Sequence, residues 1–495
     1  MKQVLLRGAV VASALALSAC AQNNGLDVAA KNMNVAGTNS IQIVGDGAWG
    51  MVGQAFDSTG PWVQIPVSDY TLTIDYVADA SHMQMTRNAP TEGDDTQNLA
   101  FREEYFDFLK SYLHEYHSGT SAWNVMVRDR IAVRPDKVAE RIAAAQSTPH
   151  GFIKLALENK APFRETSDGG ETSFTVGNQK YHGRFNAEGD LERVQTWIDN
   201  PVLGDMLVET QFEDYKSYDG VRFPGRITRL VGEQPALRLT VTDVRSNVPA
   251  AVAVPESVKN YQKPPINVTG EPLAPGVWHM RGGSHNSLLI EQADHLIVAE
   301  SSQDEAGSQA VIAKAKELAP GKPIRFIVNT HTHFDHSGGL RAYVAEGATV
   351  VTNAANVQYY KKAWSNPRTL NPDAMAKNNA VPTFQSVTDK FTLTDGKRSV
   401  DVYEMRGVHH AEAILMVHLP AEKVISVADI YRPGDEGAPP PEAPLAGAVQ
   451  LLENMERVGI VDVAKVACMH GRRIGSMEDL LIDAGRMKPK AAKAK

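Results

Sequence analysis

Hydrophobic and polar residues alternate with a period of two through much of the first half of the chain. The alternation is regular over residues 70–76, and it recurs within residues 174–198 and 237–241. A period of two is typical of strands with one buried face. Gly189 lies in a polar segment between two of these stretches and predicts a hairpin turn. The pattern therefore predicts a mostly antiparallel β domain over residues 41–248.

Three segments within this region have helical rather than strand periodicity: residues 101–116, 136–146 and 152–158. The region is therefore expected to be α+β. The run Phe212–Tyr215, followed by Asp219–Pro224, faintly resembles the half-barrel of periplasmic lipoprotein carriers, in which antiparallel strands wrap an apolar groove. A purely structural or substrate-shaping domain is an equally open interpretation.

The pattern changes after a proline-rich stretch. Six prolines fall within residues 249–275, and proline at that density favours an extended linker. Strands and helices then alternate through residues 276–484, which predicts a layered α/β domain. The strands are expected at 277–280, 287–290, 295–299, 326–330, 349–352, 400–405, 414–419 and 424–427, and the helices at 309–318, 338–346, 357–364 and 445–458.

Composition places the chain among globular proteins. Its 495 residues are 43% hydrophobic and 22% charged, which excludes a collagen, a coiled-coil rod and a wholly disordered chain. A net charge of −8 argues against a partner with a phosphate backbone, so no nucleic acid is expected. Two cysteines exclude a disulfide framework and a cysteine-rich zinc site. Nothing in the sequence predicts a protein partner.

The first twenty residues have the features of an export signal. Lys2 and Arg7 precede an apolar run that is too short to span a bilayer, and the run ends at Cys20. The junction resembles a bacterial lipobox, whose cysteine becomes lipidated; ordinary cleavage beside an incidental cysteine is the alternative. The resemblance implies a signal peptide at 1–19 and a lipid-anchored protein, in the outer membrane and facing the periplasm because Ala21 follows the cysteine. Residues 20–40 are expected to be a polar tether, and residues 485–495 a basic disordered tail.

A dense group of potential metal ligands follows the predicted strand at 326–330. Three histidines and an aspartate fall within the six residues His331-Thr332-His333-Phe334-Asp335-His336. A loop at a strand end can bring such side chains around one point. Neutral imidazole and carboxylate suit Zn²⁺, and also iron or manganese. The sequence therefore predicts a metal site here, and no other cofactor.

This motif, His-x-His-x-Asp-His, resembles the signature of the metallo-β-lactamase-fold hydrolases. The resemblance implies an αββα sandwich over residues 276–484 and a site for two metals, most simply two zinc ions. It extends residue by residue to a histidine after Gly407, an aspartate at a strand end and a histidine before Gly471. The implied ligands are His331, His333 and His410 for the first metal, Asp335, His336 and His470 for the second, and Asp429 as the bridge, with His409 as the alternative to His410.

The resemblance also implies a mechanism. Two divalent metals would lower the pKa of a water so that hydroxide can attack a carbonyl or phosphoryl centre. Asp335 would accept or donate the proton. Tyr431 lies near where lactonases place a tyrosine that binds a carbonyl oxygen, although structural packing explains it equally well. Glu300 is a candidate to orient a ligand. His285 lies in an early loop that could face the site, although a plain surface loop is the favoured interpretation.

A metal-dependent hydrolase acting on a small molecule with an ester, thioester, lactone or similar bond is the leading interpretation. Asp429 matches glyoxalase II and lactonases, whereas β-lactamase types carry a thiolate or serine there, so β-lactam hydrolysis is disfavoured. One alternative is an iron-dependent oxidoreductase of the same fold. The other is a periplasmic ligand-binding lipoprotein, in which the N-terminal domain carries an apolar ligand and the metal is structural.

Overall fold

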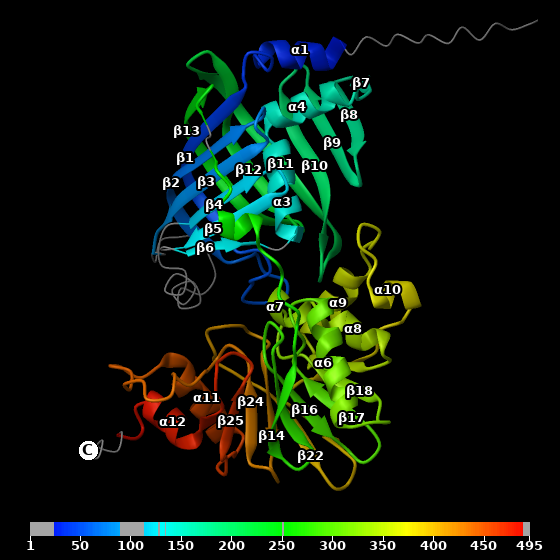
Figure 1. The fold of residues 1–495 in the computed structure, drawn as a ribbon, viewed down its shortest axis with the longest axis vertical. Helices are drawn as coiled ribbons and strands as arrows, with labels where there is room; N and C mark the ends of the chain where they lie inside the picture. The colour runs from blue at the N-terminus through cyan, green and yellow to red at the C-terminus, as the bar shows by residue number, and fades with distance from the viewer. Residues whose placement is uncertain (1–23, 90–112, 127–128, 134, 250–251, 489–495) are drawn as a thin grey trace, which may run out of the picture.

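The protein is described here as a computed structural model that covers residues 24–89, 113–126, 129–133, 135–249 and 252–488. The molecule has two halves stacked along its long axis, a β-rich N-terminal half and a layered C-terminal half (Figure 1). Within these described residues, no helix combines the length and the apolar character needed to cross a membrane. The export signal and Cys20 lie outside the described residues.

The N-terminal half is one thirteen-stranded sheet, in the order β6-β5-β4-β3-β2-β1-β13-β12-β11-β10-β9-β8-β7. Its first strand pairs antiparallel with its last, so the two ends of the half meet in the middle of the sheet. The sheet curls around α3 and α4 (Figure 1). The strands are β1 Ser40–Gly50, β2 Gln64–Asp75, β3 Ala80–Arg87, β4 Leu113–Ser118, β5 Ser121–Met126, β6 Asp129–Ala132, β7 Phe163–Thr166, β8 Gly169–Val176, β9 Gln179–Asn186, β10 Leu191–Asn200, β11 Gly204–Tyr218, β12 Val221–Val231 and β13 Gln234–Ser246.

Helix α4 (Pro149–Glu158) fills the inner face of this sheet. Phe152, Ile153 and Ala156 are fully buried among inward side chains of the strands. The preceding helix α3 (Pro135–Gln146) continues the same layer. The expected helices at 136–146 and 152–158 are therefore present, and the mostly β fold class is confirmed.

The expected helix at 101–116 is wrong over its described residues, 113–116. Residues 101–112 lie outside the described part of the chain. Residues 113–116 belong to strand β4, which pairs antiparallel with β3 on one side and β5 on the other. Pairing with two neighbouring strands outweighs the local helical pattern, because propensity is a weak preference that tertiary context overrides.

The expected polar tether at 20–40 is also wrong over its described part. Residues 24–32 form helix α1 (Asn24–Asn32), and Leu26, Ala29 and Met33 have no exposed surface. The ring of His150 in α4 lies 2.9 Å from the Met33 carbonyl oxygen. This segment is short and polar on average, but its few apolar residues share one face and close the end of the β half.

The C-terminal half contains two sheets. The first has the order β14-β15-β16-β17-β18-β19-β20, and the second β21-β22-β23-β24-β25-β26. The strands of the first sheet are β14 Thr269–Ala274, β15 Val277–Arg281, β16 Ser287–Glu291, β17 Leu296–Ala299, β18 Ile324–Val328, β19 Thr349–Asn353 and β20 Phe384–Val387. Those of the second are β21 Lys390–Thr394, β22 Ser399–Glu404, β23 Leu415–Leu419, β24 Val424–Val427, β25 Lys465–Cys468 and β26 Gly475–Ser476.

Helices cover the outer face of each sheet. One apolar cluster, with Ile290, Val328 and Val417, packs the two sheets against each other. Other clusters join the first sheet to α6, α8, α9 and α10, and the second to α11 and α12. This four-layer arrangement confirms the predicted αββα sandwich. The helices are α6 Glu305–Leu318, α7 Phe334–Ser337, α8 Leu340–Ala345, α9 Asn356–Trp364, α10 Ala374–Asn378, α11 Ala446–Arg457 and α12 Met477–Asp483.

The expected linker at 249–275 is shorter than the prolines suggested. Residues 256–259 form the short helix α5 (Glu256–Lys259), and residues 269–274 form β14, the edge strand of the first sheet. Pro272 is tolerated there because an edge strand needs to donate hydrogen bonds on one side only. The C-terminal sheet therefore begins at residue 269 rather than 276.

The packing of α1 leads to a direct test. Replacing Leu26 with Ala should lower the free energy of unfolding by about 2–5 kcal/mol, because it leaves a cavity in the core. Val28→Ala on the same helix is the matched control, since Val28 is 50% exposed and should cost under about 0.5 kcal/mol. Urea denaturation of both variants gives the two values. Equal stability of the two would restore the tether interpretation.

Candidate metal centre

The ligand motif begins where β18 ends between the two sheets. Strand β18 is central in its sheet, and His331 and His333 lie in the loop that follows it. The side-chain amide of Asn329 donates to the His331 carbonyl over 2.7 Å and holds the loop in shape. Tyr360 from α9 in turn donates to Asn329 Oδ1 over 2.7 Å. Polar groups at the carboxyl ends of such strands commonly form ligand sites.

The second part of the motif lies on the single-turn helix α7. Asp335 and His336 belong to this turn, and Ser337 Oγ donates to the His333 carbonyl over 2.9 Å. Gly338 follows because a Cβ there would meet the Gln303 carbonyl oxygen at 2.1 Å. The tight turn into α8 therefore requires a glycine, and it swings His336 back toward His331.

A first group of donor atoms gathers His331, His333, His410 and Asp429, all within 4.8 Å of one another. His410 Nε2 lies 3.1 Å from His333 Nδ1 and 3.2 Å from Asp429 Oδ2. His331 Nε2 lies 3.2 Å from the same oxygen. Ligand atoms about 2.05 Å from a tetrahedral zinc are about 3.3 Å apart. The spacing of this group therefore fits one zinc-sized ion.

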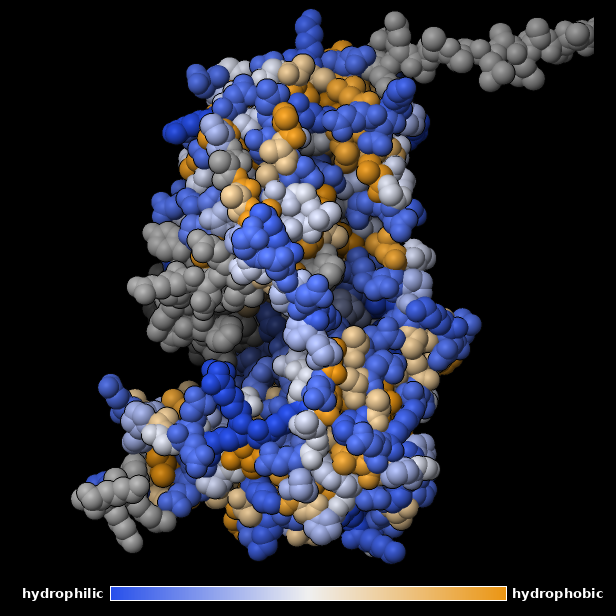
Figure 2. Space-filling model, viewed as in Figure 1, coloured by the Kyte–Doolittle hydropathy of each residue, from blue (hydrophilic) through white to orange (hydrophobic). Residues whose placement is uncertain are grey.

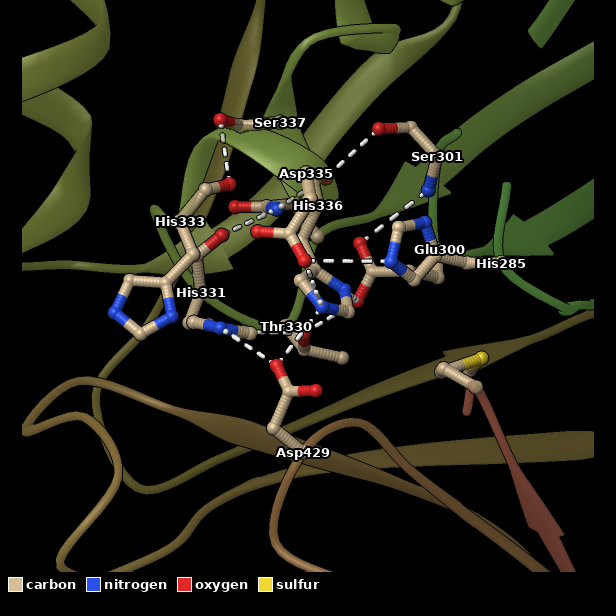
Figure 3. A network of polar contacts seen from close by, with 12 residues as sticks. His285, Glu300, Ser301, Thr330, His331, His333, Asp335, His336, Ser337 and Asp429 are labelled. Carbon is tan, nitrogen blue, oxygen red and sulfur yellow. Dashed lines mark hydrogen bonds and ion pairs between the residues drawn. The ribbon is translucent and has the colours of Figure 1, made fainter. Parts of the chain in front are cut away.

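A second group gathers His285, Asp335, His336 and His470. The Nε2 atoms of His336 and His470 lie 3.0 Å apart. Asp335 Oδ2 lies 3.3 Å from His285 Nε2 and 3.5 Å from His336 Nε2. Figure 3 shows His285, Asp335 and His336 converging on one point. The donor set again suits a divalent cation.

Asp429 contacts both groups. Its Oδ1 lies 2.6 Å from His470 Nε2, and its Oδ2 lies 2.8 Å from His336 Nε2. The same Oδ2 also faces the first group, as described above. In Figure 3 this carboxylate extends from the end of β24 toward His331 and His336. One carboxylate thus reaches two adjacent metal-ligand groups, which is the placement implied for a bridging ligand.

The charges of the centre also suit cations. Burial and the nearby His410 lower the pKa of His333 to about 3, and burial and neighbouring histidines lower that of His331, so both rings are neutral near pH 7. Burial would raise the pKa of Asp429, but His336 and His410 hold it well below its usual range. The pKa of His336 shifts the other way. Burial alone would lower it, but the nearby carboxylates of Asp429 and Asp335 outweigh burial and raise it well above its usual value. The two carboxylates therefore favour positive charge at the centre.

Two buried nitrogens add to the fit. Within the described residues, His331 Nε2 and His336 Nδ1 are buried and form no hydrogen bond of good geometry. An unsatisfied buried polar atom is costly unless it has another partner. His331 Nε2 faces the centre, where a metal would supply that partner. His336 Nδ1 lies 3.4 Å from Glu300 Oε2 on the far side of the ring.

Glu300 contacts the ligand residues on the side away from the centre. Its side chain is fully buried, and Thr330 Oγ1 donates to it. Thr330 Oγ1 also lies 2.9 Å from His331 Nδ1, so the hydroxyl and the carboxylate orient the two rings. Glu300 has a φ of +76°, a strained value that an L-residue adopts only when its surroundings require it. Partners of this kind hold metal ligands in register.

The structure places His410, rather than its neighbour, in the centre. His409 turns away, and its Nδ1 lies 2.7 Å from Gln450 Oε1 on α11. His410 is 4% exposed. All seven residues that the motif and its extension implied as metal ligands lie in the two groups.

Tyr431 is a correction to the expected site. Its hydroxyl donates to Asp483 Oδ2 over 2.8 Å, and its ring is buried against α11 and α12. It therefore packs the outer layer and does not face the ligands. Cys468 is equally inert: burial raises the pKa of its thiol to about 12.

His285 lies in the second group of donors, so the favoured interpretation of its glycine-rich stretch as a plain surface loop is wrong. Its side chain is 6% exposed and its Nδ1 lies 2.9 Å from Ser284 Oγ, which turns Nε2 toward Asp335. The sequence shows only the glycine pair before it. The structure shows that Gly282 has a φ of +107° and that a Cβ there would meet the Asn267 carbonyl oxygen at 1.9 Å. A glycine required in this way marks a tightly placed loop rather than a free one.

One wall of the centre comes from the N-terminal half. Gln54, in the loop between β1 and β2, donates to Asp335 over 2.9 Å. The molecular surface is hollowed where the two halves meet (Figure 2). A cavity of about 470 Å³ also lies between the halves, with Trp62, Trp197 and Tyr359 in its wall and Thr332 from the ligand motif at its edge.

The choice between the adjacent histidines can be tested by metal content. His410→Ala should lose the ion of the first group, because His410 supplies one of its nitrogens. His409→Ala should keep it, because that ring faces Gln450. Metal per chain after dialysis at low free zinc gives the answer. Loss of metal in the His409 variant alone would reverse the assignment.

Part of the C-terminal half matches a known protein family. The model of the metallo-beta-lactamase superfamily matches residues 280–470. No curated protein matches the chain.

Solved structures are similar to less than half of the chain. The metallo-beta-lactamase FIM-1 from Pseudomonas aeruginosa, in its mono-zinc form, is 18% identical, with a TM-score of 0.34 over 45% of this chain and 95% of that one. A metallo-beta-lactamase from Pontibacter korlensis is 17% identical, with a TM-score of 0.33 over 44% of this chain and 98% of that one. One from Erythrobacter litoralis is 18% identical, with a TM-score of 0.32 over 44% and 95%. The family model, and not these distant structures, assigns residues 280–470 to a domain of the metallo-beta-lactamase superfamily.

Proposed function

We propose that the protein is a hydrolase that cleaves an ester, thioester, lactone or similar bond of a small molecule at a centre of two divalent metal ions, most simply zinc. The observation that carries the proposal is Asp429, whose carboxylate lies within 3.2 Å of donor nitrogens from both ligand groups. A single structural ion would not need a second group of donors on the other side of that carboxylate.

The residues of the centre would have two roles, binding metal and transferring protons. His331, His333 and His410 would hold one ion, and Asp335, His336 and His470 the other, with His285 as an added donor beside Asp335. When bound there, divalent ions would supply a water of lowered pKa and positive charge for a developing oxyanion.

Asp335 is placed to handle the proton. Its side chain is 33% exposed, the most open of the carboxylates in the centre. Burial alone would raise its pKa, but His336 and His285 hold it below the usual range, so the group is ionised and can accept a proton from water. The same carboxyl group can return that proton to a leaving group.

The residue at position 429 bears on the substrate class. A carboxylate stands where β-lactamase types carry a cysteine or a serine, and it resembles glyoxalase II and lactonases in this respect. Acyl substrates other than β-lactams are therefore our proposal. From the apolar run that ends at Cys20, we also propose that the enzyme is exported and lipid-anchored through Cys20, in the outer membrane and facing the periplasm.

The direct test uses soluble chain that starts after Cys20. Bound metal is measured together with turnover of a thioester, a lactone, a phosphodiester and a β-lactam. Asp335→Asn should lower kcat for the accepted substrate by about 10²–10⁴-fold, because it removes the proton acceptor. Asp462→Asn is the control, since Asp462 lies in an exposed ion pair with Lys423. A chelator should abolish turnover in the wild type, and added zinc should restore it.

Other results would support other functions. One bound iron with no hydrolysis would favour an oxidoreductase. Tightly bound metal, no turnover and a co-purifying apolar ligand would favour a binding lipoprotein.

The anchoring proposal has its own test. The full chain should sediment with membranes of a Gram-negative host, and Cys20→Ala should release it or stop its processing, because the lipid is attached to that sulfur. Cell fractionation and labelling with a radioactive fatty acid measure both. A labelled, membrane-bound Cys20→Ala variant would contradict the assignment.

A further inference from the structure

The loop between β1 and β2, residues 51–63, crosses from the N-terminal half to the metal centre; we call it the Gln54 loop. Two backbone hydrogen bonds join it to the C-terminal half. The amide of Phe334 donates to the Gly53 carbonyl over 3.1 Å, and the amide of Glu412 donates to the Phe56 carbonyl over 2.8 Å. The first of these lies inside the ligand motif itself.

Gln54 sets the orientation of Asp335. Its Nε2 donates to Asp335 Oδ1 over 2.9 Å. The other oxygen, Oδ2, is then left facing His285 and His336. A carboxylate held in this way presents one chosen oxygen to the second donor group. The amide belongs to a residue that lies 281 positions earlier in the chain.

Ala55 sets the tautomer of His333. Its carbonyl oxygen lies 2.9 Å from His333 Nε2. A carbonyl can only accept, so Nε2 carries the hydrogen and Nδ1 keeps its lone pair. That Nδ1 is the atom that faces His410 in the first donor group. Carbonyls that accept from the outer nitrogen of a metal-bound histidine are a common way to fix the ring.

The Gln54 loop is seated firmly on both halves. Trp62 stacks edge-on against Phe334 at 5.3 Å between ring centres, and its indole nitrogen donates to the Val231 carbonyl over 3.1 Å. Gly53 has a φ of +85°, and a Cβ there would lie 2.3 Å from the Phe334 ring. The fit therefore tolerates only glycine at this position and leaves the loop little room to move.

We infer that the N-terminal half is part of the metal centre, with Gln54 and the Ala55 carbonyl acting as positioning groups for Asp335 and His333. The inference rests on the proposed function only in taking these two residues as metal ligands. It assigns the β-rich half a role in setting metal affinity, whatever the substrate is.

The test measures metal binding in the full chain, apart from activity. Gln54→Ala should weaken binding at the second group about 10–100-fold, the effect typical of removing such a partner, and leave the first group unchanged. Gln54→Glu should weaken it further, because a second carboxylate would face Asp335. Zinc competition against a chromophoric chelator gives both affinities.

The matched control is Gln42→Ala. Gln42 lies on β1 of the same sheet, and its amide donates to Thr73 Oγ1 over 3.0 Å, away from the metal centre. It should bind metal as the wild type does. Melting of the metal-free variants separates positioning from folding: Gln54→Ala should melt with the metal-free wild type.

Three outcomes would overturn the inference. If wild type binds two ions and Gln54→Ala binds them equally well, the inference fails while the proposed function stands. If Gln54→Ala weakens metal only in proportion to a loss of metal-free stability, the role is structural. If wild type binds no metal, the proposed function fails and the inference fails with it.

Discussion

The metal centre depends on one largely enclosed carboxylate, that of Asp429, which is 16% exposed and surrounded by imidazoles. Asp429 lies within 3.2 Å of nitrogens from His331, His336, His410 and His470. An unpaired charge at this depth would be very costly, so the fold must supply positive charge around it. Neutral histidines cannot do so alone, because they carry no net charge. Cations satisfy the carboxylate and the ring nitrogens together.

The fold explains how residues from distant segments reach that carboxylate. Three strand ends meet where the two sheets face each other: β18 leads to the ligand motif, β24 to Asp429 and β25 to His470. Both β18 and β24 lie inside their sheets and are largely buried. Rigid strands buried on both faces suit a site whose donors must hold their spacing within fractions of an ångström.

Much of this could be predicted from the sequence, because the motif packs four donors into six residues and glycines mark its neighbours. The layered fold followed from long apolar strands that alternate with helices. His285 could not be found in the same way, since only the tertiary fold brings its loop beside Asp335. Tyr431 was expected at the site because lactonases place a tyrosine near this position, whereas its hydroxyl donates to Asp483.

Contacts between the halves were also beyond sequence reasoning. Gln54 and Asp335 are 281 residues apart, and neither the period of β1 nor the composition of its loop indicates a partner. The tether prediction for the α1 segment was wrong for a similar reason, because the burial of this helix depends on a surface that only the folded sheet provides. Local patterns report which face of an element is apolar, but they do not report what will cover it.

The decisive measurement is anomalous diffraction from crystals of the zinc-loaded full chain. We expect two zinc peaks on either side of Asp429. One should be bonded to His331, His333 and His410, and the other to Asp335, His336 and His470, with His285 within bonding reach of the second. A single peak held by one group alone, or peaks that avoid Asp429, would contradict it.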